Sequence, residues 1–88
     1  MNLTTPLVHP NGTSKKELLN GYTNAHSAVQ KALEAVRQTV PNGRDYYPIE
    51  HAAYERARSE HLDRVSRLNA VAEELMALAT AVYDQGNT

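Results

Sequence analysis

The segment VPNGRDYYP at residues 40–48 separates two long stretches of helical pattern and so decides the fold. Pro41 disfavours helical dihedral angles in the residue before it, and the Asn42-Gly43 pair readily adopts left-handed turn conformations. Pro48 suits the first turn of a helix, because its fixed φ angle is helical and its missing N–H needs no partner there. We therefore predict a chain reversal over residues 41–48, between two helices.

The first helix is predicted over residues 14–40. Ser14 can cap it, because its hydroxyl can accept the N–H of Glu17 while the Glu17 carboxylate reaches back to Ser14. Apolar side chains then recur at steps of three and four, as on one face of an amphipathic helix. They are Leu18, Tyr22, Ala25, Val29, Ala32, Val36 and Val40. The residues before the helix, 1–13, contain Pro6, Pro10 and an Asn-Gly pair, which predict a flexible N-terminal arm.

The second helix is predicted over residues 48–85, with 86–88 as a tail. Its apolar positions keep a heptad-like spacing. They are Tyr54, Ala57, His61, Val65, Leu68, Ala72, Leu75, Ala79 and Val82, while Leu62, Val71, Met76, Leu78 and Tyr83 add apolar surface elsewhere. Over residues 68–83 the apolar arc is wider than one neighbouring helix can cover. This half of the helix is therefore expected to contact other copies of the chain.

The expected fold class is all-α: an antiparallel two-helix hairpin over residues 14–85, with a long second helix, assembling into a helical homo-oligomer. A chain of 88 residues buries only a modest fraction of its surface alone, and with no Cys it has no disulfide to stabilise it. The hairpin brings the apolar half of the second helix beside Leu18, Leu19 and Tyr22, where we place the assembly surface. Gly21 would let another backbone approach this surface closely.

Charge and hydropathy exclude several kinds of partner. The chain has nine basic and ten acidic side chains and a net charge of −1, which argues against binding to long nucleic acid or to an anionic membrane. Its first twenty residues hold no apolar run resembling a signal peptide, and it has no stretch of eighteen consecutive apolar residues. A cytoplasmic location is the expectation that follows.

Catalytic and metal-binding patterns do not emerge from the sequence. The histidines, His9, His26, His51 and His61, lack zinc-site spacing, and we expect His26 and His61 to be hydrogen-bonded core or interface residues. No nucleophile elbow, P-loop or dinucleotide-binding turn is present. We therefore predict no catalytic residue, no metal, no cofactor and no enzymatic activity.

The loop between the helices carries the chain's densest polar chemistry. Arg44 offers a planar fork for phosphate or carboxylate, and Tyr46 and Tyr47 offer aromatic faces. The predicted ligand-binding residues are Asn42, Gly43, Arg44, Tyr46, Tyr47 and Arg58, and the expected ligand is a cyclic nucleotide or another small phosphate compound. A structural interpretation stays open. Tyrosines beside a turn commonly cover the end of a hairpin, and Arg44 can pair with Asp45, Glu50 or a carboxylate of a neighbouring chain.

The PNGRDYYP loop at residues 41–48, followed by a helix rich in Ala, Arg and Glu, resembles small all-helical proteins of bacteriophages and prophages. In size and helical class the chain is also similar to the phage anti-CBASS sponges, which sequester cyclic nucleotide signals of bacterial immunity between the subunits of an oligomer. This resemblance implies an anti-defence protein in the cytoplasm of a bacterial host. It transfers no individual binding residue.

Two functions of different classes are compatible with these observations. In the first, the protein is a non-enzymatic oligomer that binds and sequesters a small anionic nucleotide-like signal. In the second, it is a helical protein–protein interaction module, an adaptor or an inhibitor of a host protein, that needs no small ligand.

Overall fold

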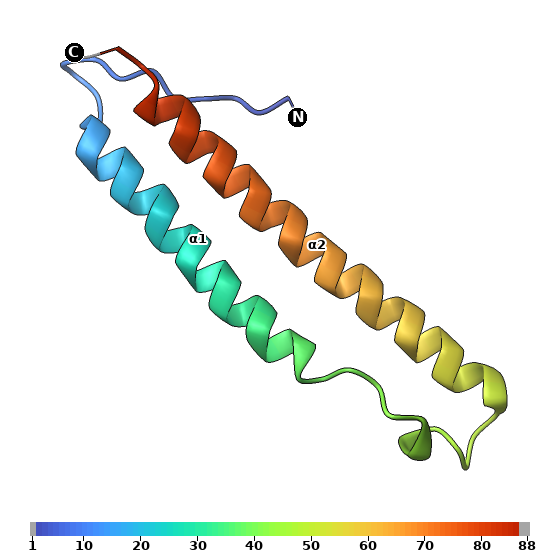
Figure 1. The fold of residues 1–88 in the computed structure, drawn as a ribbon. Helices are drawn as coiled ribbons and strands as arrows, with labels where there is room; N and C mark the ends of the chain where they lie inside the picture. The colour runs from blue at the N-terminus through green and yellow to red at the C-terminus, as the bar shows by residue number, and fades with distance from the viewer. Residues whose placement is uncertain (1, 87–88) are drawn as a thin grey trace.

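The computed structural model describes residues 2–86, within which all regular structure is helical. Helix α1 spans Lys15–Arg37, a short 3₁₀ helix η1 spans Gly43–Asp45, and helix α2 spans His51–Tyr83. Figure 1 shows α1 and α2 lying side by side and running in opposite directions. The predicted antiparallel hairpin with a longer second helix is therefore confirmed.

Helix α1 begins where the sequence predicts and ends earlier. Ser14 is its N-cap, and the Ser14 Oγ atom accepts the N–H of Glu17 at 3.1 Å. The predicted end at residue 40 is wrong, since the helix ends at Arg37. Its last carbonyls are used in a tighter turn, because the N–H of Thr39 donates to the Val36 carbonyl at 2.9 Å and the Thr39 hydroxyl donates to the same oxygen at 2.6 Å.

Helix α2 also begins later than predicted, at His51 and not at residue 48. Pro48 lies in a turn that follows η1, and the N–H of Ile49 donates to the carbonyl of Tyr46 at 3.0 Å across that turn. Glu50 is extended, with φ −107° and ψ 156°, and precedes the first helical residue. The helix ends at Tyr83, two residues before the predicted boundary, and part of the predicted tail, residues 87–88, lies outside the described residues.

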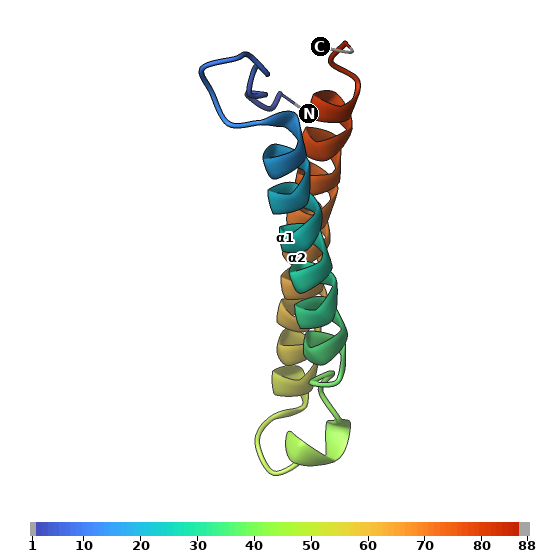
Figure 2. The same ribbon diagram turned by 90° about the vertical axis from the view of Figure 1, so that its left-hand side faces the viewer.

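The core is a thin seam between the two helices. Its buried side chains are Leu33, Ala72, Ala79, Val82 and His61. The α2 members of this set all belong to the predicted stripe, whereas Ala32 and Val40, predicted on the α1 stripe, are exposed. The hairpin is one helix thick in Figure 2, and its principal extents are 62 × 22 × 17 Å. Two helices share a single contact face, so most side chains of the chain stay partly or fully exposed.

His61 departs from the expectation of a hydrogen-bonded histidine. Its side chain is 4% exposed, and its Nδ1 atom has no hydrogen-bond partner within the described part of the chain. An unpartnered buried polar atom lowers the stability of a fold, because it has lost its contact with water without replacement.

The N-terminal arm lies across the C-terminal end of α2 (Figure 1). The Gln85 side chain forms two hydrogen bonds with the arm. Its Oε1 atom accepts the N–H of Val8 at 2.7 Å, and its Nε2 atom donates to the Pro6 carbonyl at 2.6 Å. Lys15 adds a bond from its Nζ atom to the Gln85 carbonyl at 2.8 Å. The arm predicted to be flexible thus has specific anchors over residues 6–8. In residues 2–86, neither long helix combines the length and the apolar character needed to cross a membrane.

Candidate functional site

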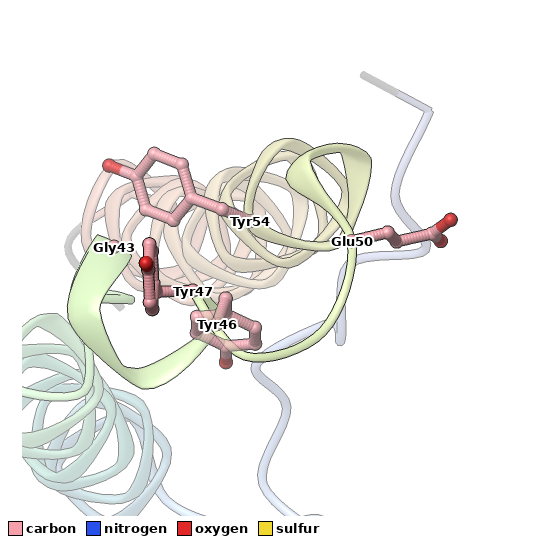
Figure 3. A pocket seen from close by; sticks show the side chains of 5 residues that line it. All are labelled: Gly43, Tyr46, Tyr47, Glu50 and Tyr54. Carbon is pink, nitrogen blue, oxygen red and sulfur yellow. The ribbon is translucent and has the colours of Figure 1, made fainter.

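A tyrosine-lined hollow lies at the loop end of the hairpin. Its volume is about 390 Å³, and Gly43, Tyr46, Tyr47, Glu50 and Tyr54 line it. The 3₁₀ helix η1 turns the chain so that the loop tyrosines lie beside the first turn of α2, which supplies Tyr54 (Figure 3). Asn42 holds this local fold, because its side-chain oxygen accepts the N–H of Arg44 at 3.1 Å. We call this feature the tyrosine hollow.

The three rings of the tyrosine hollow differ in exposure. Tyr46 and Tyr54 are half-buried and in contact, with ring centroids 6.3 Å apart and planes inclined by 50°. That distance lies within the range of favourable aromatic pairs. Tyr47 is 87% exposed, and it has no such partner among the described residues. The hollow therefore combines a fixed aromatic pair with one ring that is free to contact a ligand.

Glu50 brings a carboxylate to the edge of the hollow but directs it away from the rings (Figure 3). It accepts a hydrogen bond from the Arg56 guanidinium at 2.6 Å, and both side chains are 60% exposed. An ion pair so exposed contributes about 0–1 kcal/mol to stability. Its more important effect is on the loop, because the pairing of Glu50 with Arg56 removes one of the partners considered for Arg44.

The two predicted phosphate-binding arginines lie outside the lining of the hollow. Arg44, in η1, and Arg58, one helical turn beyond Tyr54 on α2, are both exposed. Within residues 2–86, neither guanidinium forms an ion pair, so the alternative pairing of Arg44 with Asp45 or Glu50 is not adopted. Of the predicted ligand-binding residues, the structure brings Gly43, Tyr46 and Tyr47 together in the hollow and leaves Asn42, Arg44 and Arg58 beside it or farther along α2.

Two lining residues, Glu50 and Tyr54, are not among the predicted ligand contacts, and of these Tyr54 adds a ring to the hollow. Its place on the apolar stripe of α2 pointed to a role in packing, and its contact with Tyr46 depends on how the loop folds back. A signal was available, because residues near a predicted turn and on its inner stripe must lie close to the loop. The structure groups no three His, Asp or Glu side chains closely enough to hold a metal ion in the part it describes.

Two apolar grooves flank the hairpin at its opposite end. The larger, about 400 Å³, is lined by Glu17, Leu18, Gly21, Tyr22, Ala25 and Leu75, and we call it the Gly21 groove. The smaller, about 210 Å³, is lined by Leu19, Thr23, Met76, Ala79, Thr80 and Tyr83, and we call it the Leu19 groove. Both grooves lie where the sequence placed the assembly surface.

Comparison with known proteins assigns no relationship, since no family model, no curated protein and no solved structure matches the chain.

Proposed function

We propose that the protein is a non-enzymatic binding protein that sequesters a small nucleotide-like phosphate compound, such as a cyclic nucleotide, with its base in the tyrosine hollow. The observation that carries this proposal is the grouping of three tyrosines around a hollow of about 390 Å³. Pockets for small ligands begin at about 300 Å³, and stacking of a base on an aromatic side chain contributes roughly 1–3 kcal/mol.

The described lining of the hollow suits a flat ring, because its one charged side chain, Glu50, is paired with Arg56 and points away from the tyrosine rings. No basic side chain is part of the described lining, so the ring of the ligand is the group that enters. The phosphate then lies at the rim, toward the unpaired guanidinium of Arg44 or Arg58, whose planar fork suits phosphate oxygens. A net charge of −1 over the chain is compatible with one small anion and unfavourable for a polymer of phosphates.

Sequestration fits a phage protein acting in the cytoplasm of its bacterial host. A binding protein of this kind lowers the free concentration of a defence signal in proportion to its own abundance, and it needs no chemistry on the ligand. Binding without catalysis needs few polar groups in the site, and the hollow contains few.

The proposal is tested by a thermal-shift titration of the full chain with cyclic mononucleotides, cyclic dinucleotides and cyclic ADP-ribose isomers. Binding to the native state at a hundredfold excess over Kd stabilises it by about 2.7 kcal/mol, which raises the melting temperature measurably. Chromatography of the recovered ligand should show it unchanged. No shift at millimolar ligand, or conversion of the ligand, would rule the proposal out.

Matched variants locate the site. Tyr47→Ala should weaken binding by roughly tenfold or more, because one stacking surface is lost. Tyr83→Ala, which removes an exposed tyrosine from the opposite end of the hairpin, should leave binding unchanged. Arg44→Ala should also weaken binding through loss of the phosphate contact, and retained affinity in both loop variants would place the ligand elsewhere.

A second candidate, a protein–protein interaction module, is favoured by the exposed apolar side chains of α2, Leu62, Val71 and Met76. Such a module would bind a host protein in the absence of any nucleotide. It is distinguished by Arg44→Ala, which should then be harmless to function, whereas Leu75→Asp should disrupt assembly under either function.

A further inference from the structure

The hairpin exposes more surface than a compact chain of its mass. Its solvent-accessible surface is 6501 Å², whereas a compact monomer of 9.7 kDa exposes about 5,100 Å². The excess, about 1,400 Å², is larger than the roughly 800 Å² that each partner contributes to a standard interface. The radius of gyration, 18.8 Å, likewise exceeds the value of about 12 Å expected for a compact domain of this length. The chain therefore has enough uncovered surface for a stable dimer.

The Gly21 groove is the surface best suited to that interface. It is the larger of the two grooves, and on α2 its Leu75 belongs to an apolar stripe with Val71 and Leu78, four residues before it and three after it. Val71 is exposed in the single chain and Leu78 is half-buried. The apolar surface of α2 thus continues past the groove, beyond the reach of α1.

The Leu19 groove is less suited to a second helix. It has about half the volume of the Gly21 groove, about 210 Å³ against about 400 Å³, and the Lys15 ammonium lies 5.6 Å from the centre of the Tyr83 ring at its end. The Thr23 hydroxyl already bonds its own helix, donating to the Leu19 carbonyl at 2.8 Å. Lys15 of the same chain therefore already lies over the Tyr83 end of this groove, and the Thr23 hydroxyl has no donor left for a partner.

Gly21 itself has no role within one chain that requires glycine. A Cβ atom at this position would meet no described atom within 4 Å, and the residue is exposed in a helix interior. Glycine there lowers helix stability by about 1 kcal/mol relative to alanine. Because Gly21 has no side chain, another helix can approach the groove closely. That contact offsets the loss of helix stability only in an assembly.

We propose that a second copy of this chain docks in the Gly21 groove, related by a two-fold axis, so that two hairpins form a four-helix bundle. A two-fold interface uses the same surface on both copies, and each copy carries the same excess of uncovered surface. A net charge of −1 per chain presents little repulsion between the copies. The interface lies at the arm end of the hairpin and the tyrosine hollow at the loop end, so the two proposals stand separately.

Single-cysteine labelling tests the interface directly, because the chain has no Cys of its own. Gly21→Cys introduces a thiol that is open in one chain, and Asn20→Cys introduces an exposed thiol beside it that does not line the groove. Alkylation of Gly21→Cys under native conditions should slow by about tenfold or more when the protein concentration is raised and the dimer forms. Asn20→Cys should react at the same rate throughout. Equal rates for the two thiols in associated protein would overturn the proposal.

A charge variant and its matched control test the interface through the oligomeric state. By sedimentation velocity the wild type and Asn20→Glu should be dimers, while Gly21→Glu should be monomeric, since a carboxylate would be buried in the groove. Association retained by Gly21→Glu, or a monomeric wild type, would overturn the proposal. If Gly21→Glu is unfolded as a monomer, the labelling comparison still decides. If the wild type is a dimer but binds no nucleotide, the function proposed for the tyrosine hollow is wrong and the proposed interface is unaffected.

Discussion

Gln85 holds Val8 by a hydrogen bond of 2.7 Å that joins residues from opposite ends of the chain. Its side chain acts as a fork, because the amide nitrogen donates to the Pro6 carbonyl while the amide oxygen accepts from Val8. An amide side chain has a donor and an acceptor on separate atoms, so it can bond both backbone groups at once. The contact makes the arm part of the folded structure.

Substitution of Gln85 should release the arm. Gln85→Glu replaces the donor with a second acceptor facing the Pro6 carbonyl, and Gln85→Leu removes both bonds. Each lost bond contributes roughly 1 kcal/mol, so the amide of Val8 should exchange with solvent at least about fivefold faster. Asp84→Asn, at the exposed neighbouring position, is the control. Hydrogen exchange read by mass spectrometry or NMR measures the effect, and unchanged exchange at Val8 would mean that another contact anchors the arm.

The features predicted from the sequence are those set by local periodicity. The α2 stripe through Ala72, Ala79 and Val82 is buried as the heptad spacing indicates, since helix geometry alone fixes which residues share a face. The Ser14 cap is equally local, because its bond spans three residues. These features need no knowledge of the rest of the fold.

Features that depend on how the loop folds were not predicted. Pro48 satisfies the rule for a first helical turn and yet lies in a turn after η1, because the bond between Ile49 and Tyr46 extends the loop. The choice of Arg56 as the partner of Glu50, and the contact between the Tyr46 and Tyr54 rings, follow from the same fold. Such positions are set by contacts between elements, which residue spacing does not encode.

Removal of the Ser14 cap should destabilise the start of α1. Ser14→Ala leaves the N–H of Glu17 without its acceptor and should lower the free energy of unfolding by about 1 kcal/mol, whereas Ser14→Asp, another good N-cap, should retain most of it. Urea denaturation followed by circular dichroism measures both variants at one protein concentration. Equal stabilities for Ser14→Ala and the wild type would show that water replaces the cap without loss.

Replacement of His61 by an apolar residue should stabilise the protein. His61→Leu removes the unpartnered Nδ1 atom from the core, and burial of such an atom costs on the order of 1–3 kcal/mol, partly offset by the imperfect fit of leucine. We expect a net gain of about 1 kcal/mol in the free energy of unfolding. Ser59→Leu, at an exposed position of the same helix, controls for the added apolar side chain. A loss of stability in His61→Leu alone would mean that Nδ1 finds a partner in solution.

Because the core is thin, truncation of Leu33 should cause the largest loss of stability. Leu33 is 1% exposed, whereas Leu62 on the other long helix is 52% exposed, so the same substitution removes the same atoms from two different environments. Leu33→Ala should lower the free energy of unfolding by about 2–5 kcal/mol through lost burial and a cavity, enough to unfold a chain with so few buried side chains. Leu62→Ala should cost less than about 1 kcal/mol if that position faces solvent in the assembled protein. Thermal unfolding at two protein concentrations measures both variants. A large loss in Leu62→Ala would instead show that a partner covers the middle of α2, and the interface would then extend well beyond the Gly21 groove.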